Sequence, residues 1–167
     1  MNISNNIFLT SFIVFTFIMV IYPIYLFLRY LFEAIAFYKM SNRRNDRHPW
    51  IAWIPFANEY LRGKIAYNTR SGGIAMLICK IATVIFTILV YMGTKSANAS
   101  IEAINKFIYI ISLVLSIGAT VFYYITTYII YKKYSKKYFI MTLFTILTLG
   151  ALEPIFVFVI RNNNLSK

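Results

Sequence analysis

The chain has 167 residues, of which 60% are hydrophobic, and a mean hydropathy of +0.67. Because soluble domains have about 45–50% apolar residues, this composition excludes an ordinary soluble fold and indicates a protein surrounded by lipid. The net charge of +12 does not indicate nucleic-acid binding, since the 17 Lys and Arg residues lie mostly between apolar runs, where they set membrane topology and attract anionic headgroups.

The first apolar run covers residues 7–29 and is long enough to cross roughly 30 Å of hydrocarbon. A helical pattern continues to about Met40, which would give a helix about 50 Å long. Such a helix must tilt, bend at Pro23 or emerge into the cytoplasm, and we favour emergence. Arg29 and Glu33, one turn apart, are predicted to form an ion pair at the membrane boundary.

The segment 49–66, PWIAWIPFANEYLRGKIA, is too short and too polar to cross a membrane. A proline suits the first turn of its helix, and a second one predicts a break because it cannot donate a backbone hydrogen bond. The segment is either a flat anchor on the lipid headgroups, which we favour, or a re-entrant wedge between the spans. Asn58, after the break, is a candidate to bind a freed carbonyl. The residues assigned to the membrane interface are Trp50, Trp53, Pro55, Asn58 and Arg62.

Three further apolar runs predict three more spans, at residues 73–92, 107–131 and 139–160. Lys80 interrupts the first of them and Glu153 the last. The predicted fold is therefore a single all-α membrane domain covering residues 1–167. It has four transmembrane helices and a cytoplasmic helical segment between the first and the second.

The distribution of basic residues predicts the orientation of these spans. The connection before the second span and the turn after the third lie on one side of a four-span protein, and both are basic: Lys39, Arg43, Arg44, Arg47, Arg62, Lys64 and Arg70, then Lys132, Lys133, Lys136 and Lys137. The other side receives only Lys95, Lys106, Arg161 and Lys167. We therefore expect both connections in the cytoplasm and both termini outside, in a bacterial cytoplasmic membrane.

Two stretches resemble a known group of sequences. The pattern KM-x(8)-PWIAWIPFANEYLRGKIA, starting at Lys39, and the closing EPIFVFVIRNN, starting at Glu153, are similar to an uncharacterised family of small multi-pass membrane proteins of Gram-positive bacteria. Together they cover under a third of the chain. Arg62 stands where that family more often has an apolar residue. The resemblance implies a multi-pass fold with the first motif on the cytoplasmic side, and it implies no particular activity.

Two charged residues lie within predicted spans, where charge is costly and faces protein or water. Glu153 is either a cation or proton site or, as we favour, a structural residue beside Pro154, with Arg161 two turns onward. Lys80 either pairs with Glu153 or, as we favour, extends to the cytoplasmic headgroups.

The sequence contains no recognisable catalytic set, because its single histidine follows a basic connection and no nucleophile is paired with a base. One cysteine and one histidine also make a metal site unexpected, and no cofactor motif is present. The favoured hypothesis is a non-enzymatic accessory subunit that binds the bilayer, anionic headgroups and a membrane-protein partner or a second copy. The alternatives are a small oligomeric channel or transporter using Glu153 or Lys80, and a lipid-modifying enzyme.

Overall fold

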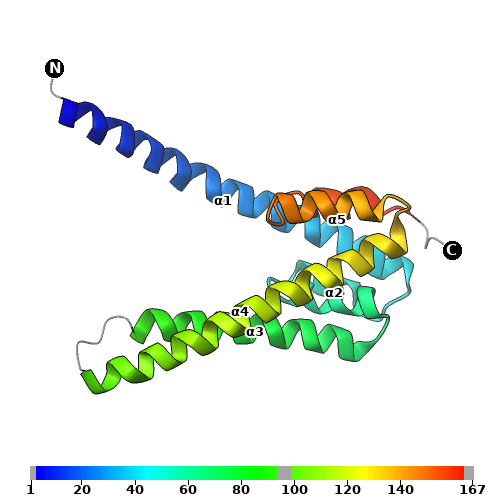
Figure 1. Cartoon of the computed structure of the whole chain (residues 1–167). Coiled ribbons are helices and arrows are strands. Elements are labelled where there is room, and N and C mark those ends of the chain that lie inside the picture. Colours follow the sequence, from blue (N-terminus) through cyan, green and yellow to red (C-terminus); the bar gives the residue numbers. More distant parts are fainter. Residues whose placement is uncertain (1–2, 94–98, 164–167) are drawn as a thin grey trace.

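A computed structural model describes residues 3–93 and 99–163, and these residues are organised entirely by helices (Figure 1). The elements in chain order are α1 (Ile3–Arg43), the 3-10 helix η1 (Pro49–Trp53), α2 (Ala57–Tyr67), α3 (Arg70–Gly93), α4 (Ala99–Tyr134), α5 (Tyr138–Leu147) and α6 (Glu153–Ile160). Three segments are long and apolar enough to cross a membrane: Phe15–Arg43, Arg70–Met92 and Lys106–Tyr134. Lys95 and Lys167, which entered the prediction of orientation, lie outside the described residues.

Helix α1 is continuous through Pro23. Its C-terminal half packs on η1, α2 and α6, whereas its N-terminal half projects away from α3 and α4 (Figure 1). Every described side chain from Phe12 to Ile24 is exposed. The helix therefore has a half embedded in protein and a half without a partner among the described residues.

The predicted break at Pro55 separates η1 from α2. Pro49 occupies the start of η1, and Phe56, just before α2, has a positive φ of 67°. Since Pro55 lacks an N–H group, the chain turns there and begins a new helix. The exposed aromatic side chains of this turn, including Trp50 and Trp53, point away from the protein core.

Helix α2 is a wedge between other helices, which corrects the favoured expectation of a flat anchor. It packs against α1, α3 and α4, and seven of its eleven residues are buried: Asn58, Glu59, Leu61, Arg62, Gly63, Ile65 and Ala66. Glycines permit the close approach to α3, because a Cβ atom at Gly63 would lie 2.2 Å from the carbonyl oxygen of Gly72. A half-immersed helix would instead keep one polar face in water.

The predicted fourth span, residues 139–160, is wrong as a single helix. Helix α5 ends at Leu147, and Leu149 and Gly150 have positive φ values of 51° and 85°. The chain then doubles back and α6 begins beside Pro154 (Figure 1). The ten residues of α5 extend about 15 Å, half of the hydrocarbon thickness. Apolar composition predicted helix over these residues but carried no information about the reversal.

The hairpin formed by α5 and α6 returns the chain to the end of the molecule where α1 and α4 end. Asn163 donates a hydrogen bond from Nδ2 to the carbonyl oxygen of Tyr134, at 2.8 Å. Arg43 donates from Nη1 to the carbonyl oxygen of Asn163, at 3.3 Å. The apolar core lies at this end, between the C-terminal halves of α1 and α4 and the helices α2 and α6, and contains Phe37, Met40, Leu61, Ile65, Ile130, Tyr131, Val157 and Ile160.

Candidate functional site

Arg62 is the centre of a buried group of charges that joins three helices. Its Nη2 atom lies 3.1 Å from Glu33 Oε2 of α1 and 3.2 Å from Glu153 Oε1 of α6. Its Nε atom lies 3.3 Å from Glu59 Oε2 on α2 itself. Three of the five acidic residues of the chain therefore converge on one guanidinium group.

Arg29 supplies the second positive charge. Its Nε atom lies 3.0 Å from Glu33 Oε1, so the ion pair expected from their spacing is present, and its Nη2 atom lies 3.7 Å from Glu153 Oε2. We call Arg29, Glu33, Glu59, Arg62 and Glu153 the ionic cluster. Helical spacing places four of these in pairs, Arg29 with Glu33 at i,i+4 and Glu59 with Arg62 at i,i+3.

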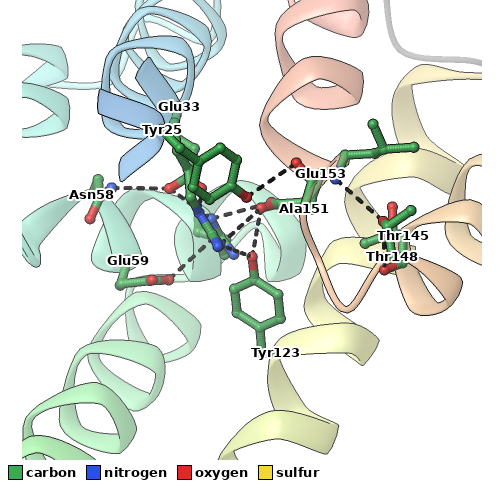
Figure 2. A network of polar contacts seen from close by, with 12 residues as sticks. Tyr25, Glu33, Asn58, Glu59, Tyr123, Thr145, Thr148, Ala151 and Glu153 are labelled. Carbon is green, nitrogen blue, oxygen red and sulfur yellow. Dashed lines mark hydrogen bonds and ion pairs between the residues drawn. The ribbon is translucent and has the colours of Figure 1, made fainter. Parts of the chain in front are cut away.

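Tyr123 of α4 contacts the ionic cluster through its hydroxyl and its ring. The hydroxyl of Tyr123 accepts a hydrogen bond from Arg29 Nη2 at 2.9 Å and donates one to Glu153 Oε2 at 2.6 Å (Figure 2). The guanidinium carbon of Arg62 lies 4.3 Å from the centre of the Tyr123 ring and 5.3 Å from that of Phe37. Both rings attract the buried cation electrostatically.

The charges of the ionic cluster are unequal, because two guanidinium groups face three carboxylates. The nearest further cation is Lys80 of α3, whose Nζ atom lies 4.0 Å from Glu59 Oε1 and whose side chain is 47% exposed. Lys80 offsets the excess negative charge at the edge of the ionic cluster. Lys80 pairs with Glu59 and not with Glu153, so the Lys80–Glu153 pair that the sequence left open is not formed.

Burial and neighbouring charges together set the pKa values of Arg62 and Glu153. Burial alone would lower the pKa of the Arg62 guanidinium, but the carboxylates of Glu153 and Glu59 outweigh it, and the pKa is raised well above its ordinary value. For Glu153, burial raises the pKa from 4.5 to about 7 against the opposing effect of Arg62. The Arg62 guanidinium therefore stays charged, whereas burial favours the neutral form of the Glu153 carboxyl more than water does.

The other residues singled out in the sequence are distributed around this group. Asn58 donates to Glu33 Oε2 at 3.4 Å and not to a freed carbonyl. Arg161 lies over the Phe158 ring and donates to the Phe158 carbonyl oxygen, so it does not serve as the partner of Glu153. Trp50 and Trp53 are 56% and 44% exposed, and Pro55 is exposed.

The interfacial assignment of Asn58 and Arg62 is therefore wrong, because protein groups and not headgroups surround both. Sequence reasoning also missed Tyr123, which is one tyrosine among fourteen and has no local mark. A partial signal for the pairing of Arg62 with Glu153 was present, because Glu153 stands as an isolated charge in an apolar stretch. Such a charge indicates a partner of opposite sign.

A cavity of about 460 Å³ adjoins the ionic cluster between α3 and α4. Arg29, Glu59, Lys80 and Tyr123 form its charged end. The remaining walls are hydroxyl-bearing and apolar: Met76, Cys79, Thr83, Val84, Thr87, Ile88, Ser116, Ala119, Thr120, Tyr124 and Leu149. Glu153 does not line the cavity, since it has no exposed surface.

The site is therefore a buried cluster of ion pairs that borders a cavity lined by polar and apolar side chains. Comparisons with protein-family models, with curated proteins and with solved structures find no match for the chain.

Proposed function

We propose that this protein is an integral membrane accessory subunit, without catalysis of its own, that binds a membrane-spanning helix of another protein through the N-terminal half of α1. The observation that carries the proposal is the isolation of that half. Its described side chains from Phe12 to Ile24 are exposed, and its backbone lies apart from α3 and α4 (Figure 1). The rest of the chain packs around the ionic cluster and the core.

The charge distribution supports three membrane crossings by α1, α3 and α4. The helix ends next to the core collect nearly all the described basic residues outside the ionic cluster: Lys39, Arg43, Arg44, Arg47, Lys64, Arg70, Lys132, Lys133, Lys136, Lys137 and Arg161. By the positive-inside rule this end is cytoplasmic. The N-terminus is then outside, and Asn163, which is hydrogen-bonded to Arg43 and Tyr134, is inside. The α5–α6 hairpin enters the cytoplasmic leaflet and returns.

The composition of α1 supports a helix as the partner. Residues 3–24 extend about 33 Å at helical rise, the thickness of the hydrocarbon core, so any surface they offer lies in the membrane. Phe12, Phe15 and Phe17 project bulky rings from this half. Helices in lipid associate by close packing, and bulky rings pack best against small residues of a neighbour.

The ionic cluster supports a structural role for Glu153 over a transport role. Its carboxylate faces two guanidinium groups and a phenol, and it does not line the cavity. An ion that used Glu153 as a binding site would have to displace these partners. The paired charges instead fasten α1, α2, α4 and α6 together and give the projecting half of α1 a rigid base.

Site-specific photocross-linking in the native membrane tests this function. A photoreactive phenylalanine analogue at Phe15 or Phe17 is expected to give a discrete adduct with another membrane protein. The same analogue at Ile140, exposed on α5, is the matched control and is expected to give no such adduct. Adducts with lipid alone at all three positions, or an adduct of only two copies of this chain, would contradict the proposal. Isolation in mild detergent should also recover the same partner in constant ratio.

A further inference from the structure

The cavity between α3 and α4 carries an inference that goes beyond the proposed function. At about 460 Å³ it lies in the range of small-molecule sites, about 300–1,000 Å³. Both of its main walls belong to helices long enough to cross the membrane. Lys80 lies ten residues after Arg70, so the charged end is about 15 Å along α3, and the cavity continues about 12 Å farther to Ile88.

The charged end of the cavity exposes both positively and negatively charged side chains. Arg29 and Lys80 present partly exposed cations, with side chains 29% and 47% exposed, and Glu59 presents a carboxylate. Together with Lys80, the ionic cluster has three cations and three anions. A ligand with a net charge would leave that charge unbalanced in a low-dielectric site, whereas a zwitterion adds none.

Hydrogen-bonding capacity along the walls favours an ammonium group. The hydroxyls of Thr83, Thr87 and Thr120 donate to carbonyl oxygens of their own helices, at 2.6, 2.7 and 2.8 Å. Their oxygen lone pairs are left as acceptors. Glu59 also lines the cavity, and its Oε1 atom lies 4.0 Å from Lys80 Nζ, which is beyond hydrogen-bond distance. A primary ammonium, with three N–H donors, matches these acceptors.

Three apolar side chains that line the cavity, those of Val84, Ile88 and Leu149, are exposed. Since these side chains face the hydrocarbon in a membrane, an acyl chain attached to a bound headgroup would lie against them and continue into the bilayer. A free polar molecule would leave this apolar surface uncovered.

We infer that the cavity is a binding site for a lipid with a phosphoethanolamine headgroup. The ammonium binds Glu59 and the threonine hydroxyls, the phosphate binds Lys80 and Arg29, and the acyl chains follow Val84, Ile88 and Leu149. Because the ionic cluster and Lys80 together carry no net charge, a zwitterionic headgroup binds there without adding an unbalanced charge.

Native mass spectrometry of the delipidated full-length protein tests this inference, with phosphatidylethanolamine, phosphatidylcholine and phosphatidylglycerol of identical acyl chains. We expect one bound phosphatidylethanolamine, at least fivefold preferred over each of the others. Equal binding of phosphatidylcholine, whose ammonium has no N–H group, would overturn the proposal, as would a preference for anionic phosphatidylglycerol. Free phosphoethanolamine is added as a competitor; displacement of the lipid at equimolar concentration would assign the site to the soluble headgroup instead.

Three variants locate the site. Lys80→Met and Glu59→Gln are each expected to reduce phosphatidylethanolamine binding at least fivefold, and Glu59→Gln to abolish the preference over phosphatidylglycerol. Thr87→Val, which does not touch the ionic cluster, is expected to reduce binding two- to threefold and keeps the test decisive if Glu59→Gln fails to fold. Lys136→Met, in the basic turn, is the control and should bind like the wild type. Unchanged binding by Lys80→Met and Thr87→Val would overturn the proposed site.

Discussion

Arg62 Nη2 lies 3.2 Å from Glu153 Oε1, and neither side chain has exposed surface. A pair of this kind costs several kcal/mol of desolvation per ion and is favourable only while both partners and their hydrogen bonds are in place. The pair joins α2, in the first half of the chain, to α6, near its end. It therefore holds the α5–α6 hairpin against the wedge helix.

Removal of the central cation should destabilise the fold. Arg62→Met leaves three buried carboxylates without their common partner, and we expect the free energy of unfolding to fall by about 3–5 kcal/mol. Reversible unfolding in detergent micelles measures this. The double variant Arg62→Met with Glu153→Gln should be more stable than Arg62→Met alone, because one orphaned carboxylate becomes neutral. Arg70→Met, at an exposed position, is the control. Wild-type stability of Arg62→Met would show that the ionic cluster does not hold the helices together.

Close packing of α2 on α3 depends on glycine. In Gly63→Ala the new Cβ would lie 2.2 Å from the Gly72 carbonyl oxygen, a backbone atom that cannot move without separating the helices. We expect a loss of more than about 2 kcal/mol, as for overpacked cores. Gly118→Ala on α4 meets nothing within 4 Å and should be neutral or slightly stabilising, since alanine favours a helix. Equal melting temperatures for the two variants would contradict the packing described.

The raised pKa of Glu153 predicts how stability depends on pH. Its folded pKa of about 7 exceeds the ordinary value of 4.5, so the folded protein holds the proton more tightly than the unfolded chain. The resulting stabilisation is complete below about pH 4.5 and is lost as the pH rises to 7, with a total of about 3 kcal/mol. Thermal unfolding between pH 4.5 and 8 should show a falling melting temperature that levels off above pH 7. Glu153→Gln should remove that slope, and a slope of the same size in the variant would assign it to other groups.

The reversal between α5 and α6 predicts the position of the C-terminus. A reporter that is active only in the cytoplasm should be active when it is fused to the C-terminus. A reporter that is active only outside should be active when it is fused to the N-terminus. A fusion after Leu147 tests the hairpin itself, because the chain has not yet returned at that point. If both ends of the chain reported the same side, an even number of crossings would be required and the three-span arrangement would fail.

The sequence was sufficient for the parts of the fold that follow from local composition. Helices α1, α3 and α4 are apolar over a membrane thickness, and Pro55 breaks a helix wherever it stands. The hairpin was not accessible in this way, because a helix that crosses lipid and two short helices that double back are equally apolar. Gly150 and Pro154 mark the turn, yet either residue is also tolerated inside a membrane helix.

The candidate site was accessible only in part. Arg29, Glu33, Lys80 and Glu153 stand out because charge is costly in an apolar stretch. Their pairing depends on where each charge lies along its helix, and the sequence placed Glu153 in a single span over residues 139–160, where the chain instead forms α5 and α6. Arg62 was assigned to the headgroup region because its helix is polar in composition, and only the packing of α2 between three other helices removes it from water.

The ionic cluster has a consequence for the order in which the chain is made. Four of its members, Arg29, Glu33, Glu59 and Arg62, precede α3, and their two positive and two negative charges balance one another. Lys80 is translated next and adds a positive charge, and Glu153 is translated last and adds the negative charge that balances it. The closing hairpin therefore supplies the last charge of the group, after the helices that hold the other charges have been made.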